Sequence, residues 1–180
     1  MSTLVGWQDE NVKIRPGEHA DVPAVLALLD GATEWLVANG RTGQWGTEPH
    51  STNPRRIGQI TGFAADGGLW IGERDGRVVG ALAVGEASEH IPPATEPELY
   101  IRLLVTDRAA KGSGIGTELI QHALHLAKQA GVELVRVDCY AGGDGALVRY
   151  YERQGFTRTE PFAVPVNDSV WPGQVLARRV

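Results

Sequence analysis

The sequence has a single cysteine, Cys139, and no long hydrophobic run. One cysteine excludes an intramolecular disulfide. The longest apolar stretch, residues 78–84, is interrupted by Gly80 and is far shorter than the roughly 20 residues needed to cross a bilayer. Met1 is followed by Ser, Thr, Leu and Val rather than by a charged start and an apolar stretch. These features predict a soluble, cytoplasmic protein without a membrane partner.

The chain also lacks an excess of basic residues, with 17 Lys and Arg against 22 Asp and Glu and a net charge of −5. An acidic balance disfavours nucleic acid as a partner. The five histidines and the cysteine show no metal-ligand spacing, so we expect no metal. Part of the acidic excess is local and would either attract a cationic substrate or form a solvated loop. Its members are Glu86, Glu89, Glu96 and Glu98.

The 180 residues contain no repeat or linker, which predicts one domain over residues 1–180. Apolar periodicity and Gly or Pro punctuation predict an α/β fold with a mixed sheet. The expected strands are residues 12–15, 69–73, 77–84, 98–105, 134–140, 156–164 and 175–180. The expected helices are residues 21–40, 55–65, 114–130 and 146–154.

The most informative segment joins the strand that ends at Leu103, Leu104 and Val105 to the helix after Gly116. Its residues are Lys111, Gly112, Ser113, Gly114, Ile115 and Gly116. Glycines let the backbone approach a ligand closely, and the first N–H groups of a helix face negative charge. The turn therefore indicates an anion site suited to a pyrophosphate.

Two common phosphate-binding motifs do not fit this segment. A P-loop would need Lys followed by Ser or Thr after its last glycine, whereas Gly116 is followed by Thr117 and Glu118. A dinucleotide fingerprint would need a third glycine where Thr117 stands. A nucleotide-binding enzyme of another fold is therefore disfavoured.

The segment resembles the acyl-CoA signature Gln/Arg-x-x-Gly-x-Gly/Ala of the GNAT superfamily, with Lys111, Gly114 and Gly116 in the three specified places. A second block, Arg-Tyr-Tyr-Glu-Arg-Gln-Gly-Phe at residues 149–156, looks like the Leu-Tyr-Glu-Lys-x-Gly-Phe block of the same family. The resemblance covers roughly Trp70 to Phe156. It implies a central, mostly antiparallel sheet that splays at one point and is flanked by helices.

The resemblance also implies an N-acetyltransferase that transfers acetyl from acetyl-CoA to a primary amine by direct attack. The backbone of Leu103, Leu104 and Val105 would bind the pantetheine arm, and the N–H groups of residues 111–117 would hold the pyrophosphate. Asp144 stands where many relatives have an Asn that contacts the pantetheine region. Because Asp lacks the amide donor, it would either make that contact or cap the following helix.

Tyr151 occupies the tyrosine position of the second block and is the expected general acid for the departing thiolate, with Tyr150 as the alternative. Adjacent helical residues point about 100° apart, so we expect one tyrosine to face the thiol and the other to pack against the sheet. Glu98 is the candidate base, near where several relatives carry a catalytic Glu, and the alternative is a surface residue just after Pro97. Glu86 is a lesser candidate. Tyr100 projects from the same strand face beside the acceptor.

The acceptor is expected to enter between residues 41–54 and the acidic loop before Glu98. Trp45 would either stack on a cation there or simply anchor its loop. It would be a small molecule, including an antibiotic, or a peptide amine, and the enzyme would be a monomer or homodimer. A non-catalytic acyl-CoA-binding module is the competing function, since it would keep the glycine turn without needing a placed acid.

Overall fold

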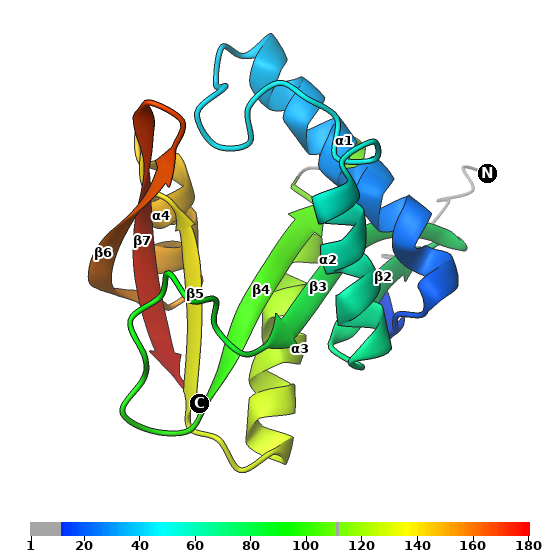
Figure 1. The fold of residues 1–180 in the computed structure, drawn as a ribbon. Coiled ribbons are helices and arrows are strands. Elements are labelled where there is room, and N and C mark those ends of the chain that lie inside the picture. Colours follow the sequence, from blue (N-terminus) through cyan, green and yellow to red (C-terminus); the bar gives the residue numbers. More distant parts are fainter. Residues whose placement is uncertain (1–11, 111) are drawn as a thin grey trace, which may run out of the picture.

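The computed structural model describes residues 12–110 and 112–180. These residues form one mixed sheet of seven strands in the order β1-β2-β3-β4-β5-β7-β6. β4 and β5 are parallel, and every other neighbouring pair is antiparallel (Figure 1). The strands are β1 (Lys13–Pro16), β2 (Leu69–Arg74), β3 (Arg77–Gly85), β4 (Glu98–Thr106), β5 (Leu134–Tyr140), β6 (Thr157–Val166) and β7 (Ser169–Arg179).

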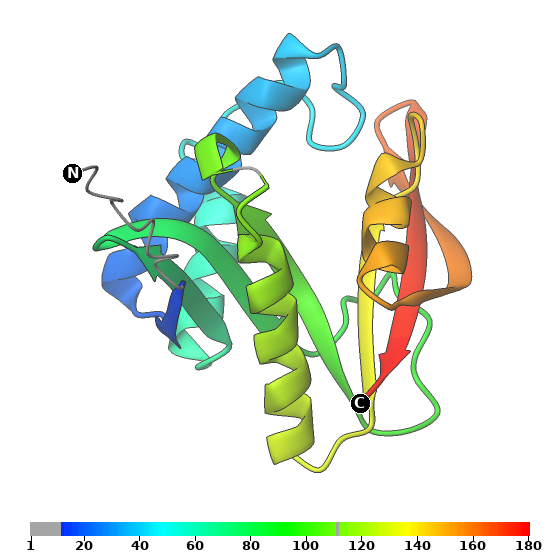
Figure 2. The same cartoon turned by 180° about the vertical axis from the view of Figure 1, so that it is seen from behind.

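Helices cover both faces of this sheet, as Figures 1 and 2 show from opposite sides. α1 (Val22–Ala38) and α2 (Pro54–Ala65) lie on one face, and α3 (Ile115–Gln129) and α4 (Ala146–Arg153) lie on the other. Short 3-10 turns, η1 (His19–Asp21) and η2 (Arg108–Ala110), precede α1 and follow β4. The predicted α/β fold with a mixed sheet is therefore confirmed. No helix among the described residues is both long and apolar enough to span a bilayer.

Each helical layer buries an apolar stripe against the sheet. On α1, Val25 and Leu29 are completely buried four residues apart, against Ile71 of β2. On α3, Leu119 and Ala123 repeat this spacing over Leu82 and other residues of a second cluster. Burying a large aliphatic side chain contributes about 1.5–3 kcal/mol, so these stripes fix both layers on the sheet.

β4 and β5 separate partway along their length. They pair from Glu98 opposite Leu134 to Ile101 opposite Val137 and no further, whereas β4 stays paired with β3 as far as Thr106. The register between β3 and β4 shifts at Arg102, which is an extra residue between the partners of Ala83 and Val84. Such a bulge bends its strand and increases the local twist. Beyond the bulge at Arg102, β4 has no strand partner on the β5 side among the described residues, as the widening gap in Figure 1 shows.

A buried polar cluster fixes the segment of residues 39–53, which joins α1 to α2. The His50 side chain is 5% exposed, with Nε2 2.8 Å from Thr33 Oγ1 of α1, and its Nδ1 accepts a hydrogen bond from Arg56 Nε at 3.1 Å. The backbone N–H of His50 donates to Asp30 Oδ1 at 2.6 Å. Because Nδ1 accepts from a cation, the ring is neutral and Nε2 carries its proton. Burial and the charge of Arg56 both lower the pKa of His50.

This cluster predicts a loss of stability on acidification. A folded-state pKa below the ordinary value of about 6.5 means that the unfolded chain binds a proton first as the pH falls. The stabilisation is thus complete above pH 6.5 and is lost as the pH drops toward the folded-state pKa. Each unit of difference amounts to about 1.4 kcal/mol. We expect His50→Asn to reduce the drop in Tm between pH 7.5 and 5.5, as measured by thermal denaturation.

The exposed His90 provides the control for this prediction. His90→Asn should leave the pH dependence of Tm as in the unmodified protein. An unchanged pH dependence in His50→Asn would contradict the assignment of the effect to His50.

Candidate active site

The glycine turn lies at the open end of the split, where β4 gives way to α3. Gly112 and Gly114 have φ values of 82° and 79°, in the left-handed region that glycine adopts without steric cost. The amide of Glu118 makes an early bond of α3 by donating to the Gly114 carbonyl at 3.0 Å, so the N–H groups of the preceding residues face away from the helix body. Lys111, the first residue of the predicted signature, lies outside the described residues.

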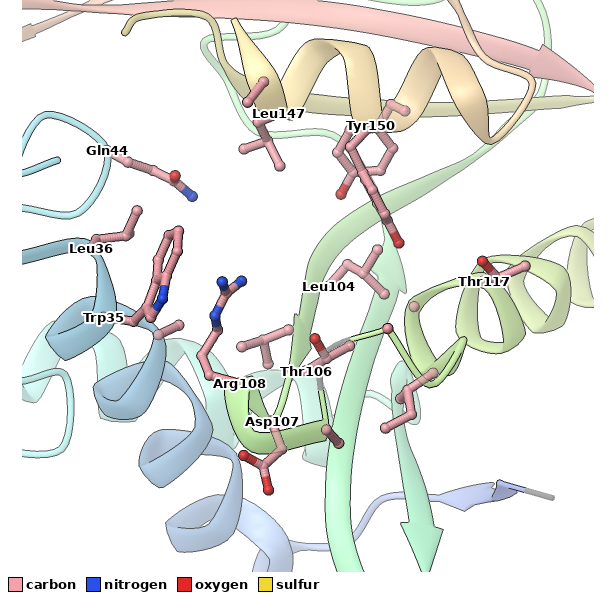
Figure 3. Close-up of a pocket in the computed structure, with 18 of the residues that line it drawn as sticks. Trp35, Leu36, Gln44, Leu104, Thr106, Asp107, Arg108, Thr117, Leu147 and Tyr150 are labelled. Atoms are coloured by element: carbon pink, nitrogen blue, oxygen red, sulfur yellow. The ribbon is translucent and has the colours of Figure 1, made fainter. Parts of the chain in front are cut away.

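A cavity of about 610 Å³ extends from this turn across the split (Figure 3). Its floor is the end of β4, including Leu104 and Val105. One wall combines the glycine turn with α4, and the opposite wall is formed by α1 and residues 41–45. The lining includes the predicted residues Gly112, Gly114, Ile115, Gly116, Thr117, Tyr151 and Trp45.

The other predicted donor-site residues lie beside the cavity rather than in its wall. The Leu103 side chain is 8% exposed and packs in the cluster beneath α1, because the strand alternation after Arg102 turns it to that face. Ser113 is exposed, and its hydroxyl donates to the Ala110 carbonyl within the turn. These positions leave their backbone groups, rather than their side chains, as the candidate contacts.

Both neighbouring tyrosines of α4 line the cavity, which differs from the expected division between cavity and sheet. Tyr151 is the more buried, at 5% exposure, and its ring centroid lies 5.8 Å from that of Phe156. Tyr150 lies over the start of α3, where a Cβ atom on Gly116 would come within 2.2 Å of its hydroxyl oxygen. Adjacent helical side chains point about 100° apart, but both tyrosines belong to the lining because the cavity extends along α4.

Burial determines the protonation state of these two phenols. It raises the pKa of Tyr151 well above the ordinary value, and the neighbouring Cys139 and Tyr150 act in the same direction. Burial also raises the pKa of Tyr150, against a smaller opposing effect of Arg153. Both side chains are therefore protonated at neutral pH, as a proton donor must be.

Glu98 and Tyr100 do not line this cavity, so the structure does not support their predicted roles as base and acceptor contact. Both lie in the paired part of β4, before the split opens. Arg136 Nη2 donates to Glu98 Oε1 at 2.8 Å, and Arg136 Nε donates to the other carboxylate oxygen. Tyr100 is 1% exposed and donates to Asp138 Oδ2 at 2.7 Å. Glu98 and Tyr100 thus stabilise the closed end of the split.

Asp144 hydrogen-bonds the start of α4, close to the second of its two expected roles, although Gly145 is the N-cap residue. Its Oδ1 accepts a hydrogen bond from the Ala146 N–H at 3.0 Å, at the start of α4. Its Oδ2 lies 3.2 Å from Arg41 Nη2, and both side chains are about half exposed. Asp144 is beside the mouth of the cavity and does not line it.

Contacts from residues 41–45 bridge the two sides of the split. Trp171 Nε1 of β7 donates to the Gln44 carbonyl at 2.9 Å. Trp45 lines the cavity beneath this bridge and meets His50 edge to face, with ring centroids 5.4 Å apart. Residues 41–45 therefore connect the cavity wall on the α1 side to β7, and the role of Trp45 in acceptor binding stays a prediction.

The charges in the cavity differ from the sequence-based expectation. None of Glu86, Glu89, Glu96 and Glu98 lines it. Glu96 instead pairs with Arg179, with Oε2 2.7 Å from Nη1, and Glu98 pairs with Arg136. Among the described residues, the charged side chains of the lining are Arg41, Asp107, Arg108 and Arg153. An acidic attraction at the acceptor side is therefore not supported.

Sequence reasoning missed Arg108 and its contact with Trp35, and the two side chains face each other within the cavity. Arg108 Cζ lies 3.7 Å from the centroid of the Trp35 ring. The two residues are 73 positions apart, and nothing in either local sequence indicates the contact. The only available signal was that Arg108 follows the strand that leads into the glycine turn.

Solved structures of low sequence identity share this fold. One, provisionally named a phosphinothricin N-acetyltransferase, is 22% identical, with 94% of this chain and 98% of that chain covered and a TM-score of 0.71. The yncA protein from Salmonella typhimurium, provisionally an acetyltransferase and solved with its cofactor acetyl-CoA, is 18% identical over 94% of each chain, with a TM-score of 0.66. A ribosomal-protein-alanine N-acetyltransferase from Brucella melitensis is 22% identical over 93% of this chain and 99% of that one, with a TM-score of 0.67.

No curated protein sequence matches the chain at a significant level. The family comparison is positive and covers both sequence blocks and the cavity between them. Residues 28–156 match the sequence model of the acetyltransferase (GNAT) family. The chain therefore belongs to the GNAT family of acetyltransferases.

Proposed function

We propose that the protein transfers an acetyl group from acetyl-CoA to a primary amine of a small molecule or peptide by direct attack. The observation that carries this proposal is the single cavity wall that combines a glycine turn at a helix start with two protonated tyrosines. The acetyl-CoA held by yncA of the same fold adds support for the donor. The acceptors in the names of two structural neighbours, phosphinothricin and a ribosomal-protein alanine, differ from each other, so the fold alone leaves the acceptor open.

The residues present fit the phosphate end of acetyl-CoA. A pyrophosphate would accept hydrogen bonds from backbone N–H groups at the start of α3, where the helix dipole favours negative charge. No atom lies within 4 Å of a Cβ built on Gly114, so the approach to the turn is open. The backbone of Leu104 and Val105 would bind the pantetheine arm, because β4 has no strand partner on this side.

Tyr151 is the proposed general acid. The amine nitrogen attacks the thioester carbonyl carbon, the carbon–sulfur bond breaks, and the phenol donates its proton to the departing thiolate. The amine loses its extra proton to solvent, and the phenol is later reprotonated from solvent. Between an ordinary phenol of pKa about 10 and a thiolate of pKa about 8.5, this proton transfer costs roughly 2 kcal/mol. Burial raises the pKa of Tyr151 and so increases this cost, whereas desolvation of the thiolate in the same cavity makes it more basic and acts in the opposite direction. Because Tyr151 is buried at the cavity wall, it is held in the protonated form.

Gly114 provides a test of donor binding. Asn and Asp have nearly equal size and both tolerate the left-handed backbone conformation of this position. Gly114→Asp adds a negative charge beside the pyrophosphate, and we expect it to bind acetyl-CoA at least about tenfold more weakly than Gly114→Asn. Isothermal titration calorimetry measures both affinities. Equal affinities of the two variants would exclude this turn as the pyrophosphate site.

Tyr151→Phe tests the proposed acid, since it keeps the ring and removes the donor. We expect kcat to fall by about 10²–10⁴, the usual effect of losing an acid catalyst, with little change in acetyl-CoA affinity. Tyr150→Phe is the matched control on the adjacent residue and should retain most of kcat. Loss of kcat in Tyr150→Phe, with activity retained in Tyr151→Phe, would assign the role to the other tyrosine.

A further inference from the structure

Arg108 faces a part of the cavity that the proposed donor site does not use. It belongs to η2, and its guanidinium is stacked on Trp35 of α1. Figure 3 shows this group directed into the cavity on the side of Trp35 and Gln44, whereas Thr117 and Tyr150 lie on the opposite side. The glycine turn leads into α3 on that opposite side, so phosphates held there would be separated from the guanidinium.

The charge of Arg108 is not neutralised within the described part of the chain. Its Nε is buried without a hydrogen-bond partner, and no carboxylate among those residues lies within ion-pair distance of the guanidinium. Asp107 points away from it in Figure 3, and Asp107 Oδ1 accepts the Ala109 N–H at 2.9 Å. Arg41 adds a second positive charge, with Cζ 5.8 Å from the Trp35 ring centroid.

The two neighbouring positive charges of Arg108 and Arg41 favour the binding of an anionic ligand group. Desolvating a cation is costly unless it is paired, and here partial burial and the repulsion of Arg41 lower the pKa of Arg108. A stacked guanidinium is held in one orientation, and its planar fork matches the two oxygens of a carboxylate. An anionic ligand group beside Trp35 would therefore satisfy the unpaired Nε and offset the repulsion between the two arginines.

We propose that Arg108, stacked on Trp35 and supported by Arg41, binds a carboxylate of the acceptor. The substrate is then an amine that also carries a carboxylate, as a free amino acid does, rather than a polyamine or another purely cationic amine. This inference rests on the proposed function, because it assigns the acceptor side of the same cavity. The protein has a net charge of −5, yet the two arginines make this part of the cavity locally basic.

Amino acids and their primary carboxamides test the proposal, because each pair has the same skeleton and only the acid carries the carboxylate. The amine of the amide is less basic, so the rates are compared per unprotonated amine. We expect kcat/KM with acetyl-CoA to be roughly 10- to 100-fold higher for the acid, the range of a hydrogen-bonded charge pair. Arg108→Gln should bring this acid-to-amide ratio close to one. Arg108→Lys should give an intermediate ratio, since it keeps the charge and loses the fork.

Arg153→Gln is the matched control, because Arg153 also lines the cavity but belongs to α4. It should leave the acid-to-amide ratio unchanged. A purely structural role of Arg108 would lower the rates with both substrates equally and keep the ratio, and that result would overturn the proposal. So would amine acetylation by the unmodified enzyme without any preference for the acid.

Binding measurements separate the remaining outcomes. Calorimetry should give the same acetyl-CoA affinity for Arg108→Gln and the unmodified enzyme. Weaker acetyl-CoA binding with an unchanged acid-to-amide ratio would assign Arg108 to the donor's phosphates and overturn the proposal. If acetyl-CoA binds but no amine is acetylated, the proposed function fails. Titration of the same amino acids and amides in the presence of CoA then decides the carboxylate site: binding of acids that depends on Arg108 supports it, and absence of such binding refutes it.

Discussion

The separation of β4 from β5 is the constraint on which the rest of this structure depends. The two strands are parallel and share four residue pairs, after which each continues with its own antiparallel partner. A parallel pair has no hairpin to keep its strands together, and the bulge at Arg102 adds local twist to β4 where the pairing stops. The result is an unpaired strand edge inside the molecule, which forms the floor of the cavity and can bind an extended ligand through its backbone.

The two ends of this split are held by interactions of different strength. At the closed end, Glu98 and Arg136 form a bidentate pair whose side chains are 15% and 7% exposed. Removing one partner of a buried pair leaves an uncompensated charge and costs about 3–5 kcal/mol. At the open end, the half-exposed pair of Arg41 and Asp144 contributes little to stability, because water and salt screen it. The closed end of the split is thus held more strongly than the open end, where the cavity lies.

Sequence patterns predicted the elements and the donor side because their signals are local. The stripes of α1 and α3, the glycine turn and the tyrosine block each occupy one short stretch, and the structure brings the turn and the block to one cavity. The role of Glu98 could not be predicted in this way. Its partner Arg136 is 38 residues away, and the pairing depends on the register of β4 with β5. The contact of Arg108 with Trp35 likewise depends on how α1 packs above the end of β4.

The same distinction applies to charge. The net value of −5 and the four glutamates near β4 describe the field far from the surface, and salt screens that field over about 8–10 Å. A charged ligand in the cavity would interact mainly with the few side chains that line it. In the described part of the chain, three of the four charged lining residues are arginines. Two of the glutamates that suggested a cationic acceptor form ion pairs instead, Glu98 with Arg136 and Glu96 with Arg179. The charge that a ligand in this cavity would meet therefore follows from local side chains, and the overall composition is a poor guide to it.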